Sequence, residues 1–396
     1  MLMSVDDLKK RVDKRTTASS APPLVPSFYI TPYADSAPGQ STDYSLTCYP
    51  SAEIPFDVNF AFFTLNDNKT PGTYGNTIDD TFLTHVRDRA AIQALMKIMQ
   101  NQKRRIFDSM IDTPNITWDQ ANVENFVRNT EGEFAPDGTF FTNNLMQNYP
   151  GVGRMWDAET SAPNGFAEVM KACFLRGITR DPDNYVFIYT TYADRSIDGL
   201  LNMVFDPTKP VDAALIELGF ERFTDLFLKR GPGLSWIETM SYSGDAPSRF
   251  AEADNYAVKY LANGDVSQLE KMRKYLSIGV APGLTSPADA QAIGSACDPS
   301  KDEGYGRFMV WAGNCPDGVN LFNSMLAARA LPLTPLLPKE HSAKEITRTK
   351  LPSPSDMRSG NRSRLFNRLA QKAEDEEDAA SEPGWLSRMT CGLFNC

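Results

Sequence analysis

Hydrophobic residues return every three to four positions through most of this chain, which is the spacing of amphipathic helices. Ser286 followed by Pro287 is typical of a helix start, while Gly231 and the pair Asn263-Gly264 are typical of helix ends. The segments with helical spacing are 77–112, 113–129, 165–178, 210–231, 248–264, 267–279, 286–296 and 318–333. The pattern therefore predicts a chain made mostly of helices.

Extended structure is indicated in two places. Residues 27–65 are rich in aromatic and β-branched side chains and are interrupted by Pro, Gly and Asp, and 184–194 is the best candidate for a buried strand. We see no internal repeat and no alternation of strands with helices. The fold class that follows is mainly α, a two-lobed helical body with a minor β region near the N-terminus; an α+β fold is the alternative.

The same pattern divides the chain into five parts. We expect a flexible arm over 1–24, an N-terminal lobe over 25–150, and a helical C-terminal lobe over 151–338. A polar tail with its charges in blocks follows over 339–382, and such composition is typical of disorder. A short apolar anchor over 383–396 closes the sequence.

Charge and composition exclude several classes of function. The 396 residues include 50 acidic and 40 basic ones, for a net charge of −10, so the whole molecule is not steered toward nucleic acid. Only two histidines occur, His85 and His341, which removes most catalytic triads and histidine-rich metal sites. The six cysteines are scattered, which argues against structural zinc and favours free thiols in a cytoplasmic compartment. We expect no metal and no cofactor.

Basic residues cluster at the ends of several expected helices. The ordinary explanation is that Lys and Arg are favoured at helix C-termini by the macrodipole. The functional alternative is a groove that binds the phosphates of single-stranded RNA between the two lobes. The candidate RNA-binding residues are Arg87, Arg89, Lys103, Arg104, Arg105, Lys229, Arg230, Arg273 and Lys274.

Two further segments carry candidate chemistry. Asp181 and Asp183 form a D-x-D pair that could hold a divalent cation, although the intervening Pro182 also suits a tight turn. The last segment places apolar residues on one face of a possible short helix, which could dock on a partner protein, rest on a membrane, or fold back on the body. Its candidate partner-binding residues are Trp385, Leu386, Met389, Leu393 and Phe394.

These features favour a non-enzymatic, self-assembling structural protein whose partners are copies of itself. A body with an arm and an acidic tail resembles the organisation of helical viral nucleoproteins and coat proteins, and single-stranded RNA in the cleft would extend that resemblance. No motif assigns the chain to a family. Two alternatives stay open, a cytoplasmic carboxylate enzyme that uses a divalent metal and an adaptor that binds only proteins.

Overall fold

The computed structural model describes the central part of the chain with gaps. The described residues are 9–10, 24–30, 48–65, 78–79, 89–111, 119–134, 140–141, 153–158, 166–191, 198–242, 244–311 and 313–329. The C-terminal tail, the apolar anchor and most of the N-terminal arm lie outside them. Within the described residues, no helix is long and apolar enough to cross a membrane.

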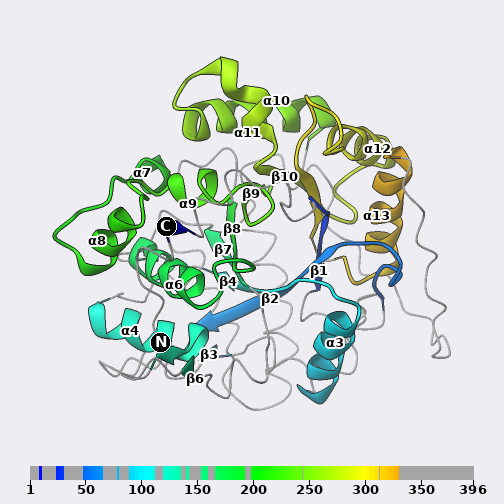
Figure 1. Ribbon diagram of the computed structural model, residues 1–396. Coiled ribbons are helices and arrows are strands. Elements are labelled where there is room, and N and C mark those ends of the chain that lie inside the picture. The colour runs from blue at the N-terminus through cyan, green and yellow to red at the C-terminus, as the bar shows by residue number, and fades with distance from the viewer. Residues whose placement is uncertain are drawn as a thin grey trace, which may run out of the picture.

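A closed barrel of parallel strands forms the centre of the molecule (Figure 1). Each strand pairs in parallel with its neighbour, and β1 pairs with both β2 and β11, which closes the sheet. In chain order the barrel strands are β1 (Ser27–Ile30), β2 (Asp57–Leu65), β4 (Ile106–Ile111), β7 (Gly153–Ala158), β8 (Val186–Thr191), β9 (Ser235–Thr239), β10 (Leu276–Val280) and β11 (Arg307–Val310). This closed parallel barrel is the (β/α)₈ architecture.

Three short strands lie outside the barrel order. The strand β3 (Ile78–Asp79) pairs antiparallel with the far end of β2. The strands β5 (Glu133–Phe134) and β6 (Phe140–Phe141) pair antiparallel with each other.

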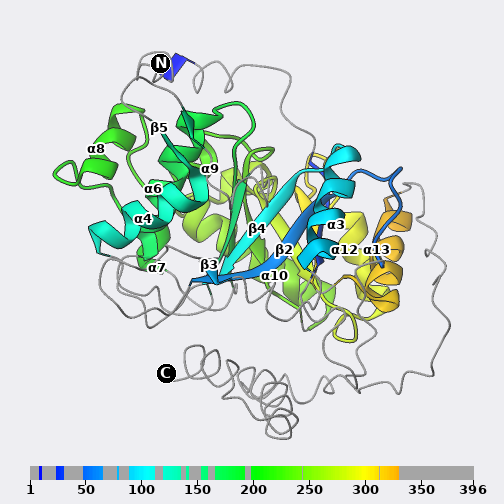
Figure 2. The same cartoon turned by 90° about the horizontal axis from the view of Figure 1, so that it is seen from below.

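Helices lie between successive strands and cover the outside of the barrel, as two views at right angles show (Figures 1 and 2). They are α3 (Arg89–Asn101), α4 (Gln120–Glu131), α6 (Phe166–Arg180), α7 (Asp198–Leu201), α8 (Pro210–Glu217), α9 (Asp225–Leu228), α10 (Ala246–Tyr256), α11 (Leu269–Arg273), α12 (Pro287–Ala296) and α13 (Pro316–Ala328). The π-helical turn η1 (Ala257–Leu261) extends α10, and the 3₁₀ turn η2 (Val266–Gln268) precedes α11.

Side chains alternate between two cores along each strand, because successive residues of a strand point to opposite faces. The inner core fills the barrel and includes Tyr29, Phe107, Met155 and Trp236. The outer core lies between the strands and the helices, and it is much larger. Residues that face the inside can therefore be recognised by their spacing of two from an inner-core residue.

The prediction of a mainly helical, two-lobed body is wrong. The sheet passes directly from β4 to β7, across the expected boundary near residue 150, because Phe107 pairs with Gly153. Two of the barrel strands, β4 and β10, overlap segments expected to be helix, and β7, β9 and β11 lie outside the two segments expected to be extended. The expected helix 267–279 ends at Arg273, and Leu276 begins a strand.

Several local predictions are confirmed. The Ser286 hydroxyl accepts a hydrogen bond from the amide of Asp289, with Pro287 at the first helical position of α12. Asn263 and Gly264 both have positive φ, as expected where a helix stops. The Asp265 carboxylate caps η2 by accepting from the amide of Ser267 at 2.9 Å.

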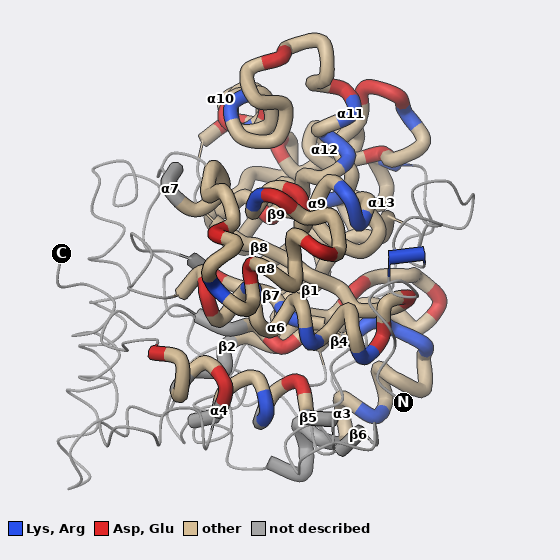
Figure 3. The backbone as a smooth tube through the Cα atoms, turned by 60° about the vertical axis from the view of Figure 1, so that its left-hand side comes forward, with Lys and Arg blue, Asp and Glu red and all other residues tan. Residues whose placement is uncertain are grey.

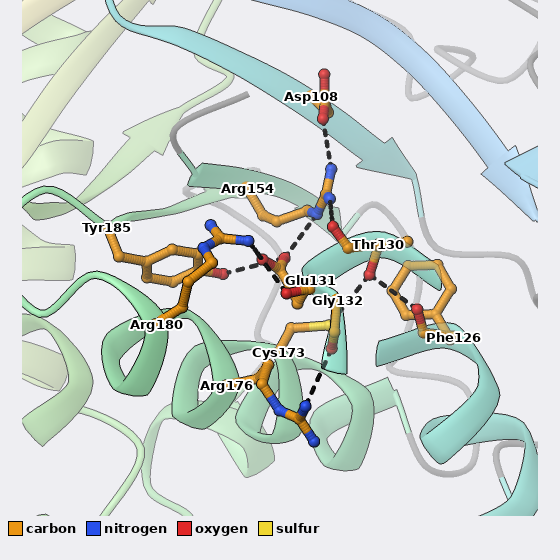
Figure 4. Close-up of polar contacts among 10 residues, drawn as sticks. All are labelled: Asp108, Phe126, Thr130, Glu131, Gly132, Arg154, Cys173, Arg176, Arg180 and Tyr185. Atoms are coloured by element: carbon orange, nitrogen blue, oxygen red, sulfur yellow. Dashed lines mark hydrogen bonds and ion pairs between the residues drawn. The ribbon is translucent and has the colours of Figure 1, made fainter. Parts of the chain in front are cut away.

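A buried network of charges joins the barrel to α4 and α6 (Figure 4). Arg154 of β7 points outward and donates to Glu131 Oε1 at 2.8 Å, to Asp108 Oδ2 at 2.5 Å and to the Thr130 carbonyl at 2.6 Å. Arg180 of α6 donates to the other oxygen of Glu131 at 3.1 Å. Because these groups are removed from water, each depends on its partners for solvation.

Asp108 in this network predicts a measurable pH dependence of stability. Burial, the largest effect, raises the pKa of this carboxyl from 3.8 to about 6, although Arg154 opposes it. The folded state therefore holds a proton that the unfolded state releases above pH 3.8, so this contribution is fully present below that pH and is lost as pH rises through 6. At about 1.4 kcal/mol per pKa unit, its size is about 3 kcal/mol.

Asp108→Asn should remove that contribution, because asparagine does not titrate. We expect the difference in unfolding free energy between pH 4.5 and pH 7, measured with urea, to shift in the variant toward greater relative stability at pH 7. All other titrating groups cancel in the comparison with the parent chain. An unchanged difference would contradict the raised pKa.

Candidate active site

A continuous row of polar side chains crosses the inside of the barrel. Asp157 pairs in register with Thr190, Thr190 with Glu238, Glu238 with Ser277, and Ser277 with Arg307. All five are buried. The row runs from the carboxyl end of β7 to the amino end of β11, so it connects the two ends of the barrel.

Glu238 lies in the middle of this row and is held entirely by the protein. Its Oε1 accepts from Ser27 Oγ at 2.8 Å and from the Trp236 indole nitrogen at 3.0 Å. Its Oε2 accepts from the Tyr29 hydroxyl and, at 3.4 Å, from Thr190 Oγ1. Burial raises the pKa of Glu238 above its ordinary value, and the hydroxyl and indole donors oppose that rise. This carboxyl therefore orients other groups rather than meeting a ligand.

Asp157 is the acidic member of the row at the carboxyl end of the barrel. It is the second-last residue of β7 and is buried. Its spacing of two from the inner-core residue Met155 places it on the inner face. In barrels of this kind the carboxyl ends of the strands carry the reactive groups, whereas the amino ends serve stability.

Two aromatic rings lie at the same end of the barrel. Trp311, directly after β11, and Tyr242, shortly after β9, are half-buried and stack with ring centroids 6.4 Å apart and planes 26° apart. The buried Tyr29 ring lies next to Trp311, with the two ring centroids 5.3 Å apart. The amide of Trp311 donates to the Val280 carbonyl at 2.9 Å, which fixes its main chain to β10. This pair offers an apolar aromatic surface at the same end of the barrel as Asp157.

The amino end of the barrel is closed by arginines. Arg105 forms a double hydrogen bond with Asp57, at 2.8 and 2.6 Å, and Arg307 stacks on Trp236 with its guanidinium 3.6 Å from the ring centroid. Burial lowers the pKa of Arg307 to about 9, and the charges of Asp57 and Glu238 counter this only in part. This end of the inner core is therefore filled by an arginine–aspartate pair and by an arginine stacked on a tryptophan ring.

Most of the described side chains expected to bind RNA bond to other groups of the protein. Arg104 donates to the carbonyls of Ser51 and Ile54, Arg230 donates to those of Pro182 and Tyr185, and Arg273 pairs with Asp254. Lys103 is exposed, and Lys274 donates to the carbonyl of Lys301. Most precede β4, β9 or β10 directly, so they gather near the amino end of the barrel, away from Asp157.

Three basic candidates remain, of which Lys229 and Arg89 are among the described residues. Lys229 donates to the Gly219 carbonyl and lies 3.4 Å from Asp225. Arg89 begins α3, and Arg87 lies outside the described residues. Figure 3 shows basic and acidic positions interspersed along the described chain rather than gathered on one side.

The other sequence-based candidates fall in three groups. Asp181 accepts two hydrogen bonds from the Asn184 side chain and one from its amide, in the turn before β8 that Pro182 suggested. No group of three or more metal-binding side chains occurs among the described residues. Cys173 and Cys315 are free thiols, as expected of the cysteines, and both are buried; Cys315 caps α13. The proposed partner-binding residues from Trp385 to Phe394 lie outside the described residues.

Sequence reasoning missed Asp157, Glu238, Tyr242 and Trp311. Their segments show too little alternation to be recognised as strands, and the polar residues that face the inside interrupt the apolar runs. The available signal was the placement of single acidic or aromatic residues at the ends of short apolar runs, as in 153–158, 235–242 and 307–311.

Comparison with known proteins gives structural likeness but no sequence relative. No family model and no curated protein matches the chain. An endo-β-N-acetylglucosaminidase from Cordyceps militaris is similar over 82% of this chain and 95% of its own, at 15% identity and a TM-score of 0.41. A chitinase from Rhizomucor miehei is similar over 76% of this chain and 98% of its own, at 12% identity and a TM-score of 0.44. A GH18 chitinase from Cycas revoluta is similar over 77% of this chain and 99% of its own, at 11% identity and a TM-score of 0.45.

The assignment of the barrel rests on the strand pairing of this chain, not on those low scores. The barrel overturns the prediction of a self-assembling, nucleocapsid-like structural protein. The RNA-binding version of that prediction placed the RNA in a basic cleft between two helical lobes. The described chain has one closed sheet instead, and most of its predicted RNA-binding side chains hold carbonyls and carboxylates of the protein itself.

Proposed function

We propose that the chain is a glycoside hydrolase whose reaction takes place at the carboxyl end of the barrel. One observation carries the proposal: Asp157, the acidic end of the polar row, lies at the same end of the barrel as the stacked Tyr242–Trp311 pair. A carboxylate beside an aromatic surface can act on a ligand that has both polar and apolar faces, and a sugar ring is such a ligand.

The chemistry available to the chain supports this reaction class. Carboxyl groups can supply all the acid and base catalysis that glycoside hydrolysis needs, without a cofactor. With two histidines in the whole sequence, carboxylates are the main acid–base groups that the chain offers. Position at the carboxyl ends of the strands agrees with the general rule for enzymes with this barrel.

The burial of Asp157 defines its role in the proposed reaction. A carboxylate beneath the reacting sugar can stabilise positive charge as it develops, but it cannot easily reach a leaving group on the solvent side. The proton for the leaving oxygen then comes from another carboxyl group. The next acidic residue in the sequence is Glu159, which lies outside the described residues and is therefore tested by mutation rather than placed.

The first substrates to test are β-linked oligosaccharides of N-acetylglucosamine, the class acted on by the enzymes named above. In this substrate class the acetamido oxygen can attack C1 while the leaving oxygen takes a proton, and water then opens the cyclic intermediate. Such a substrate supplies its own nucleophile, so the protein needs one acid and one charge-stabilising carboxylate. Asp157 is assigned the second role.

Mass spectrometry of chito-oligosaccharides incubated with the full chain tests the proposal. We expect shorter oligosaccharides that carry one new reducing end for each bond cleaved. Cellooligosaccharides of the same length, which lack the acetamido group, are the matched substrates and should stay intact. The proposed function is refuted if a correctly folded chain cleaves neither series and no other glycoside in a panel.

A further inference from the structure

We infer that Arg249 and Glu252 of α10 are positioning residues for the Tyr242–Trp311 pair. The inference that this pair receives the sugar ring rests on the proposed function, whereas the positioning itself is a claim about the protein alone. Neither side chain belongs to a strand or to the polar row. Both act through the segment that follows β9.

Arg249 ties three segments together at the carboxyl end of the barrel. It is fully buried, and its Nη2 donates to the Tyr242 carbonyl at 2.8 Å. Its Nη1 donates to Thr285 Oγ1 at 3.1 Å, and that same hydroxyl accepts from the amide of Ala281 at 3.3 Å. The guanidinium therefore connects α10 to the segments that follow β9 and β10.

Glu252 holds the preceding residue from the same helix. Its Oε2 accepts from Ser241 Oγ at 2.9 Å. Residues three apart lie on one face of a helix, so Arg249 and Glu252 hold two consecutive residues of the chain. This double attachment fixes both the position and the direction of the main chain at Tyr242.

The ring of Tyr242 has little freedom once its main chain is fixed. A Cβ added at Gly279 of β10 would lie 3.0 Å from Tyr242 Cε1, so the ring packs closely against β10 at a position without a side chain. On the other side it stacks on Trp311, whose amide is bound to the Val280 carbonyl. A shift of the Tyr242 carbonyl would therefore disturb the stacking of the two rings.

Arg230 provides a matched control for the loss of a buried guanidinium. It is also buried, and it also donates to main-chain carbonyls, those of Pro182 at 2.7 Å and Tyr185 at 2.8 Å. These contacts lie before β8 and β9, at the amino end of the barrel. Arg230→Met and Arg249→Met thus remove the same group from equivalent surroundings at opposite ends.

The experiment compares near-ultraviolet circular dichroism and saccharide kinetics of the full-length variants. Subtracting the Trp311→Phe spectrum from that of the parent chain isolates the signal of the stacked tryptophan. We expect Arg249→Met to lose this signal and to raise KM for a chito-oligosaccharide about fivefold, with a much smaller change in kcat. Arg230→Met should keep the tryptophan signal and the parental KM, although it should lose about as much thermal stability as Arg249→Met.

Glu252→Ala keeps the test decisive if Arg249→Met does not fold, because Glu252 is only partly buried. It should weaken the same tryptophan signal and raise KM in the same direction. A parent-like signal in folded Arg249→Met or Glu252→Ala, or an equal loss of signal in Arg230→Met, would overturn the inference. If the parent chain cleaves no saccharide, the proposed function fails, and the dichroism still decides the positioning.

Discussion

Asp157→Asn is expected to lower kcat for chito-oligosaccharide hydrolysis by about 10³-fold, because it removes the charge that stabilises the reacting sugar. The same loss should appear with an aryl glycoside of N-acetylglucosamine. The aryl group is nitrophenyl, which leaves as the anion with little need of a proton, so loss with both substrates identifies a residue that acts on the sugar rather than on the leaving oxygen. The measurement is steady-state kinetics with both substrates.

Glu159→Gln is the comparison that separates the two roles. If Glu159 supplies the proton, its variant should lose hydrolysis of the oligosaccharide and keep much of its activity toward the aryl glycoside. Both substitutions are nearly isosteric, so thermal unfolding within a few degrees of the parent chain excludes a folding defect. An Asp157→Asn variant with parental kcat on both substrates would remove Asp157 from the mechanism.

Arg154→Met is expected to cause the largest loss of stability, about 3–5 kcal/mol in the free energy of unfolding. The substitution removes the arginine that pairs with Asp108, one of the two arginines that pair with Glu131, and a donor to the Thr130 carbonyl. The protein would then keep negative charge inside a region from which water is excluded. Urea unfolding at pH 7 measures the change.

Lys209→Met provides the comparison with an exposed ion pair. Lys209 is about half exposed and lies 2.9 Å from Glu168. Exposed pairs contribute at most about 1 kcal/mol because water and salt screen them. Equal losses for Lys209→Met and Arg154→Met would show that the network in Figure 4 does not hold α4 and α6 to the barrel.

The helices were predictable where the apolar period is long and clear. The segments 165–178, 248–264, 286–296 and 318–333 overlap α6, α10, α12 and α13, since their buried faces are set by local spacing. The segment 210–231 was expected as one helix, but it divides into α8 and α9. Gly219 has a φ of +91° in the turn between them, a conformation that ends a helix.

The strands were mostly not predictable, and the reason is physical. A barrel strand of four to six residues buries both faces, so it has neither an alternating pattern nor enough length to stand out. Here the inner face is also polar. Residues such as Ser277 and Arg307 interrupt the apolar runs of β10 and β11, and their burial depends on partners far along the chain.

The candidate site was hidden by the same feature that creates it. Asp157 and Glu238 look like surface residues in isolation, because an acidic side chain is rarely buried without partners. The partners of Glu238 are supplied only when β1, β8 and β9 come together. Most of the described basic candidates lie between the end of a helix and the start of a strand.

Closure of the barrel sets a condition on how this protein can be made. Ser27 of β1 pairs with Met309 of β11. The sheet therefore keeps two open edges until its first and last barrel strands pair. During synthesis on a ribosome, every intermediate that lacks β11 exposes unpaired main-chain groups on β1 and β10, and such edges favour aggregation. A pause in translation upstream of residue 307 should therefore prolong dependence on chaperones, whereas one after residue 330 should not.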